Sequence, residues 1–233
     1  MRIAKAVFIK QAKDMLKNPM VFVLFLTFPV VAFLVTFFMG DLPENDLMPE
    51  NAIVNMMAAV FAGMGLITAV SAVISEDIER KSLRFLIIAG VKPHQYLIGT
   101  CGMFLLAGAI TSGLFALIGN FTGTEIVKFL AVMISGTAAS ILLGTVIGMW
   151  AKNSQSATSL GMPAAIIVGF TPMLANFNET VERFANILFT QQINVVTNDF
   201  DAGLFRPLMV IAANIAVFVI LFIVAYKKKG LKG

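Results

Sequence analysis

The sequence predicts an all-α integral membrane protein, and its composition is the first reason. Of its 233 residues, 58% are hydrophobic and 13% are charged, against roughly 25% charged in soluble domains. The mean hydropathy is +0.89, and apolar runs of about 20 residues match the length that a helix needs to cross a bilayer. We therefore predict a single transmembrane domain over residues 1–233, with six transmembrane helices, an N-terminal amphipathic interfacial helix and a further helix in a cytoplasmic loop.

Residues 1–18 are predicted to form the interfacial helix. When residues are placed 100° apart, Lys10, Lys13 and Lys17 share one face, and apolar side chains take the other. The basic face would contact anionic membrane lipid, at about 1 kcal/mol for each Lys near the surface. Pro19 should end this helix, because the residue before a proline is disfavoured in the helical region.

Six apolar segments follow and are predicted to span the membrane. They cover about residues 20–39, 52–74, 96–119, 127–150, 158–174 and 208–226. The fifth is short and is expected to be broken by Pro163 and Pro172, since a proline removes a helical hydrogen bond. Two polar stretches complete the chain: residues 75–95 as a cytoplasmic loop and residues 175–207 as an extracellular segment.

The orientation follows from the basic residues. Lys and Arg concentrate in residues 1–18, 75–95, 151–157 and 227–233, and elsewhere the sequence has only Lys128, Arg183 and Arg206. Cytoplasmic loops of membrane proteins carry an excess of Lys and Arg. This pattern places both termini on the cytoplasmic side of a multi-pass protein.

Motifs for catalysis are absent from the sequence. It has no G-x-S-x-G, no H-E-x-x-H and no G-x-x-x-x-G-K-[ST] phosphate loop. The single cysteine, Cys101, and the single histidine, His94, offer no metal site. We therefore expect no enzyme activity, no catalytic residue, no metal and no cofactor in this chain. Ion coupling through a buried carboxylate is also disfavoured, because no ionisable residue lies well inside a predicted span.

The loop at residues 75–95 has the densest charge in the sequence. Ser75 can act as the N-cap of a helix whose first turn holds Glu76, Asp77 and Glu79, where the helix dipole favours acids. The same helix should end near Gly90, because glycine suits the left-handed conformation after a helix C-terminus. The loop is thus predicted to form one short amphipathic helix.

Side-chain pairs along this helix support the prediction. Glu76 with Arg80, and Asp77 with Lys81, are four residues apart in the favourable order. An apolar side, which we expect to pack against the membrane bundle, is formed by Ile78, Leu83 and Phe85. From these residues alone, a solvated helix lying on the membrane is an equally good interpretation.

The loop resembles that of ABC type-2 exporter permeases. The resemblance rests on residues 79–86 (ERKSLRFL), the Gly-Val pair at 90–91, Pro93, and residues 96–99 (YLIG). It extends along the chain as the basic N-terminal helix, six spans and a proline-containing fifth span. Residues 178–189 are similar to the outer re-entrant helices of that family.

The resemblance implies a permease subunit of an ATP-driven exporter in a bacterial cytoplasmic membrane. In that family the loop is a coupling helix that rests on a separate ATPase subunit. That subunit binds the ATP and Mg²⁺. Two permease chains, identical or paralogous, form the pathway and move a hydrophobic or amphipathic cargo (lipid, drug or peptide) outward. The residues expected to dock the ATPase are Glu76, Asp77, Glu79, Arg80 and Arg84. Those expected to line the pathway are Phe170 and Met173.

Two other functions stay open at this point. A membrane scaffold or immunity-type protein would bind a partner through the loop without transport. A secondary carrier would follow an ion gradient and would not need an ATPase. No nucleic-acid partner is expected.

Overall fold

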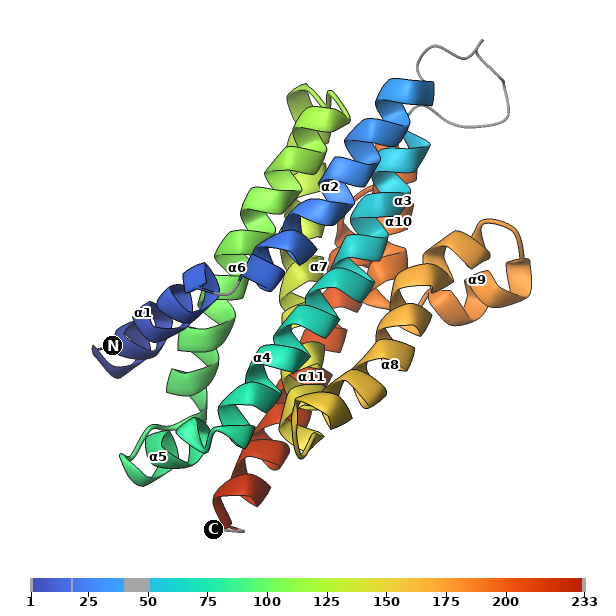
Figure 1. The fold of residues 1–233 in the computed structure, drawn as a ribbon. Coiled ribbons are helices and arrows are strands. Elements are labelled where there is room, and N and C mark those ends of the chain that lie inside the picture. The colour runs from blue at the N-terminus through green and yellow to red at the C-terminus, as the bar shows by residue number, and fades with distance from the viewer. Residues whose placement is uncertain (1, 18, 40–50, 232–233) are drawn as a thin grey trace.

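A computed structural model describes residues 2–17, 19–39 and 51–231, and this part of the chain is helical with no β-strand (Figure 1). The helices before the α4–α5 turn are α1 (Arg2–Lys17), α2 (Pro19–Met39), α3 (Ala52–Val60), the π-helical segment η1 (Phe61–Gly65) and α4 (Leu66–Glu79). Those after it are α5 (Ser82–Ile88), α6 (Pro93–Ile118), α7 (Gly123–Trp150), α8 (Ser154–Ala175), α9 (Glu179–Ala185), α10 (Phe189–Asn198), the 3₁₀ turn η2 (Phe200–Ala202) and α11 (Phe205–Leu231).

Five of the described helical segments are long and apolar enough to cross a membrane. They are Ala52–Glu79, Pro93–Ile118, Gly123–Trp150, Ser154–Ala175 and Phe205–Lys228. A shorter apolar segment, Val23–Phe38, lies within α2. The predicted fold class, an all-α membrane protein with about six such helices, is confirmed. Helix α1 ends at Lys17 and α2 begins at Pro19, in agreement with the expectation that the interfacial helix ends before this proline.

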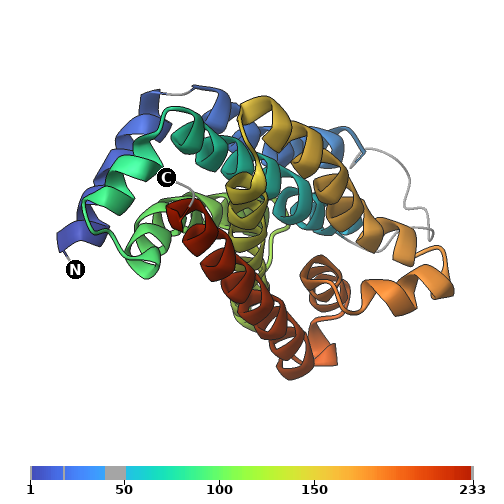
Figure 2. The ribbon, with the colours of Figure 1, turned by 90° about the horizontal axis from the view of Figure 1, so that it is seen from below.

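Helix α7 lies at the centre of the bundle. It packs against α4, α6 and α11, which surround it in Figure 2. Gly144 and Gly148 allow close approach to α4, because a Cβ on Gly144 would lie 2.9 Å from the carbonyl oxygen of Ile67. A Cβ on Gly148 would likewise lie 2.7 Å from Cβ of Ile74. This G-x-x-x-G pair therefore serves packing within one chain.

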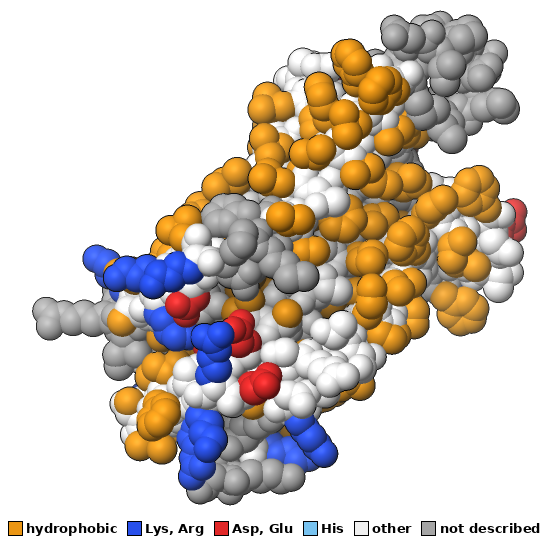
Figure 3. Space-filling model, viewed as in Figure 1, with side chains coloured by type: hydrophobic (Ala, Val, Ile, Leu, Met, Phe, Trp, Pro, Cys, Tyr) orange, Lys and Arg blue, Asp and Glu red, His pale blue; other side chains and the backbone are white. Residues whose placement is uncertain are grey.

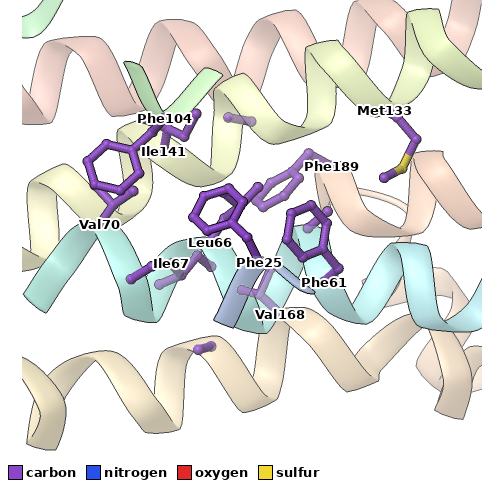
Figure 4. Close-up of a cluster of buried hydrophobic side chains, with 14 of the residues drawn as sticks. Phe25, Phe61, Leu66, Ile67, Val70, Phe104, Met133, Ile141, Val168 and Phe189 are labelled. Atoms are coloured by element: carbon purple, nitrogen blue, oxygen red, sulfur yellow. The ribbon is translucent and has the colours of Figure 1, made fainter. Parts of the chain in front are cut away.

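Aromatic side chains fill the core beside these helices (Figure 4). The ring of Phe61 lies 5.7 Å from that of Phe25 on α2 and 5.8 Å from that of Phe115 on α6. Centroid distances in this range are favourable for aromatic pairs. The π-helical segment that carries Phe61 is thereby held between α2 and α6.

Helix α8 is continuous, contrary to the prediction that Pro163 and Pro172 break it. Pro172 has no N–H to donate to the carbonyl oxygen of Val168, four residues earlier. The hydroxyl of Thr190 on α10 donates to that oxygen instead, at 2.6 Å. The neighbouring helix thus satisfies the acceptor that the proline leaves free, which is how membrane helices tolerate proline.

The segment at residues 175–207 is more ordered than its polar sequence suggests. The short helix expected within residues 178–189 is present as α9, and the side chain of Asn178 caps it by accepting from the N–H of Thr180 at 2.9 Å. Helix α10 was not predicted. It packs against α7, α11, α3 and α8, and buries Gln191, Gln192 and Asn194 along with its apolar residues.

Candidate functional site

The end of α4, the following turn and α5 form the region where the sequence predicts a partner-binding helix. We call residues 76–88 the elbow. It lies at the same end of the molecule as α1 and the last turns of α11 (Figure 1). Basic side chains gather at this end, whereas apolar side chains cover most of the rest of the visible surface (Figure 3).

The elbow consists of two helices, and this corrects the predicted single helix from Ser75. Helix α4 continues to Glu79, because Ile74 and Ile78 extend its buried face by another turn. The hydroxyl of Ser75 donates back to the carbonyl oxygen of Ala72 at 2.8 Å and caps nothing. The acidic residues therefore lie in the last turn of α4. The predicted end is correct: α5 stops at Ile88, and Gly90 is left-handed with φ 81°.

Asp77 joins four helices at the elbow. Its Oδ1 accepts from Nζ of Lys10 on α1 at 2.7 Å and from Oγ of Ser82 on α5 at 2.7 Å. Its Oδ2 accepts from the hydroxyl of Tyr96 on α6 at 3.2 Å. The Asp77 side chain is 10% exposed. Asp77 pairs with Lys10 rather than with Lys81, the partner expected from the sequence.

Lys10 is the charged partner in this junction. Burial tends to lower the pKa of its ammonium group, but the hydrogen bond to Asp77 and the charges of Asp77 and Asp14 outweigh burial and raise that pKa. Lys10 therefore carries its charge at physiological pH. Since Asp77 is engaged by three donors inside the chain, its bonds here serve internal support.

Glu79 makes a second connection, from the end of α4 to the start of α8. Its Oε2 accepts from both the backbone N–H of Ser154, at 3.0 Å, and the hydroxyl of Ser154, at 2.9 Å. An acidic group at a helix N-terminus is favoured by the free N–H groups and the helix dipole. Glu79 thus lies at the N-terminus of α8, which corresponds to the fifth predicted span, and the sequence analysis missed this contact.

The remaining docking candidates are at the surface. Glu76 and Arg80 form the predicted pair across one helical turn, with Nη2 of Arg80 2.6 Å from Oε1 of Glu76. Their side chains are 39% and 75% exposed. Arg84 is also exposed, on α5.

Some apolar residues of the elbow are buried and others are exposed. Leu83 is buried and Ile78 packs against the core. Phe85 is 69% exposed and does not pack against the bundle. Phe85 follows Leu83 by two residues, which places it about 200° away around the helix. With Ile88, which is 73% exposed, it forms an apolar face that the described part of the chain leaves exposed.

The connection between α5 and α6 is tied to the end of α11. The hydroxyl of Tyr226 donates to the carbonyl oxygen of Val91 at 2.9 Å. Its ring lies 6.0 Å from that of Tyr96, the residue that also binds Asp77. The elbow is therefore linked to the last helix as well as to α1, α6 and α8.

The predicted pathway residues lie on α8. Phe170 is 37% exposed and Met173 is partly exposed. They follow Gly169, which crosses the π-helical segment at Gly63: a Cβ on Gly63 would lie 2.7 Å from the backbone nitrogen of Gly169. The carbonyl oxygen of Ala62 in this segment accepts a hydrogen bond from Ser140 on α7. Single π-helical turns occur frequently at functional sites.

Comparison with known proteins identifies the class. The ABC-2 type transporter family model matches residues 3–179. This range covers α1 from its second residue, the elbow and the other helices through α8, and it ends at the first residue of α9. The chain belongs to this family, and it is a multi-pass membrane protein of the ABC-type permease class. A search of curated proteins found no match to the chain.

Proposed function

We propose that this chain is the permease subunit of an ATP-driven exporter. Two copies, or one copy and a paralogue, would form the pathway in a bacterial cytoplasmic membrane. A separate ATPase subunit would bind ATP and Mg²⁺ and dock on the cytoplasmic side. Membership of the ABC-2 type transporter family supports an ATPase partner in general.

The junction at Asp77 is the observation that carries this proposal. One carboxylate at the end of α4 binds groups on α1, α5 and α6, while Glu79 in the same turn binds the start of α8. Interactions of this kind between packed elements can carry coupling between distant sites. A displacement of α5 by a partner would therefore be passed to several spanning helices together.

The exposed face of α5 is the proposed docking surface for the ATPase. Phe85 and Ile88 supply large apolar groups that are mostly exposed in the described part of the chain, and Arg80 and Arg84 lie exposed on the same elbow. Interfaces commonly combine an aromatic anchor with arginine side chains. Glu76 is at the same surface, paired with Arg80. Asp77 and Glu79 would act from inside by holding the elbow in place.

The cargo route is proposed to lie between two permease chains. Phe170 and Met173 would line it from α8, close to the Gly63–Gly169 crossing. Apolar side chains such as Ile166 and Ile167 are also exposed on α8. A path of this character suits a hydrophobic or amphipathic cargo, such as a lipid, a drug or a peptide, moving outward.

Co-reconstitution tests the proposal. The chain and its ATPase would be placed in lipid vesicles, and movement of a fluorescent lipid or dye between leaflets would be followed with ATP added on the side of the ATPase. We expect movement that requires both proteins and ATP. Movement driven by an ion gradient without the ATPase would support a secondary carrier. Binding of the ATPase without any movement would support a scaffold.

A further inference from the structure

A cavity opens beside the elbow, between the ends of α4, α5, α7 and α11. Its volume is about 630 Å³. Four basic residues line it: Lys81 and Arg84 on the elbow, Lys152 before α8, and Lys228 near the end of α11. None of the described residues that line this cavity is acidic.

A neighbouring cleft at the elbow is lined by both basic and acidic residues. That cleft, of about 530 Å³, is lined by three basic residues and by three acidic ones, Asp14, Glu76 and Asp77. Its charges neutralise one another, since Lys10 binds both Asp77 and Asp14, and Arg80 binds Glu76. Of these two hollows, only the cavity beside α7 and α11 has basic residues and no acidic ones among its described lining residues.

The interior of this cavity is apolar. Leu83, Met149 and Ala225 line it and are each at most 3% exposed. Trp150, the last residue of α7, also lines it and is 58% exposed. Trp is enriched at the level of lipid headgroups, where its ring meets both the apolar and the polar region. The cavity therefore offers an apolar floor below a basic rim at the end of a spanning helix.

We propose that this cavity binds the headgroup region of an anionic phospholipid. The lipid phosphate would lie among Lys81, Lys152 and Lys228, and the glycerol and first methylene groups would contact the apolar floor. Basic pockets between membrane helices on the cytoplasmic side suit anionic headgroups. A purely ionic partner, such as an acidic protein segment, would use the rim but not the floor. The inference does not depend on ATPase coupling or on the cargo.

The single tryptophan of the chain makes a local test possible. The purified chain would be placed in bilayers of phosphatidylcholine that contain brominated phosphatidylglycerol or, separately, an equal fraction of brominated phosphatidylcholine. Bromine quenches indole fluorescence only at short range, so the emission of Trp150 reports the lipid at the cavity. We expect phosphatidylglycerol to be preferred over phosphatidylcholine by at least about fivefold. This ratio corresponds to about 1 kcal/mol, the contribution of one Lys near an anionic surface.

Variants separate a bound lipid from general attraction to the basic surface. Combined Lys81→Gln, Lys152→Gln and Lys228→Gln substitutions should reduce the preference to about one. Lys13→Gln is the matched control, because Lys13 is exposed on α1 and does not line the cavity. It should keep the preference.

Equal quenching of the unsubstituted chain by the two brominated lipids would overturn the proposal, and this comparison needs no variant to fold. A preference lost equally in Lys13→Gln would also overturn it, by showing a diffuse effect of charge. Equal quenching together with a change in Trp150 emission on addition of the purified ATPase would assign the cavity to that protein instead.

Discussion

The ammonium group of Lys10 and the carboxylate of Asp77 lie 2.7 Å apart, although 67 residues separate them in the sequence. The contact fixes α1 against the turn between α4 and α5. Because Asp77 is largely buried, removing one partner would leave the other with poorly compensated charge. The pair therefore holds the elbow in one position relative to α1.

Asp77→Asn should destabilise the protein by about 1–3 kcal/mol, the cost of leaving buried polar groups poorly satisfied. Asp14→Asn is the matched control, since Asp14 is 54% exposed and also pairs with Lys10, at 3.3 Å. It should change stability by less than about 0.5 kcal/mol, as for other surface pairs. Unfolding of both variants in mild detergent measures this difference. Equal stability of the two would contradict the assigned role of Asp77.

Glu79→Ala should loosen the start of α8, because it removes the acceptor for the N–H and hydroxyl of Ser154. Hydrogen exchange of the backbone amide of Ser154 measures this directly, and exchange should become faster. Glu76→Ala is the control, as the partner of Glu76, Arg80, lies beside it on the same elbow. Faster exchange at Ser154 in both variants would point to general disruption of the elbow.

Gly63→Ala should destabilise the crossing of α8 over the π-helical segment. The added Cβ would meet the backbone of Gly169, with its nitrogen 2.7 Å away, and backbone cannot move aside cheaply. Overpacking of this kind costs about 1–3 kcal/mol. Gly113→Ala on α6 has no atom within 4 Å of the new Cβ and should be neutral or slightly stabilising. Thermal unfolding in detergent distinguishes them, and matching midpoints would contradict the close approach.

Thr190→Val should destabilise the chain by about 1 kcal/mol, a typical net value for a hydrogen bond. The substitution keeps the shape of the side chain but leaves the carbonyl oxygen of Val168 without its donor. Thr124→Val is the control, because Thr124 is exposed in the first turn of α7. A second test is Pro172→Ala, which restores an N–H to α8 and should reduce the cost of Thr190→Val. An unchanged cost would argue against compensation of Pro172 by Thr190.

Hydropathy predicted the general fold because each spanning helix carries its signal in its own residues. The helix boundaries in the elbow were predicted incorrectly, because the prediction used only the residues of the elbow itself. Ser75 followed by three acids has the local signature of a helix start, but the burial of Ile74 and Ile78 decides that α4 continues. That burial depends on packing against other helices, which local patterns do not contain.

Helix α10 was not predicted, because its polar residues are typical of a solvent-exposed segment. Asn194 donates to the side chain of Asn176 at 3.0 Å, and Gln192 donates to the carbonyl oxygen of Asn186 at 2.7 Å. The fold supplies these partners from the residues that directly follow α8 and α9, and this allows the amides to be buried. The link from Glu79 to Ser154 was likewise hidden, since 75 residues separate the two.

Purification of the tagged chain from its native host in mild detergent tests the central claim most directly. Proteins recovered with it would be identified by mass spectrometry. We expect an ATPase with a phosphate-binding loop in stoichiometric amount, and its loss when Phe85→Ala and Ile88→Ala are combined. Ile110→Ala is the matched control, because Ile110 is 62% exposed and lies on α6, away from the elbow. It should retain the ATPase. Recovery of no ATPase, under conditions that preserve a control transporter complex, or equal recovery with the α5 variant, would contradict docking through the elbow.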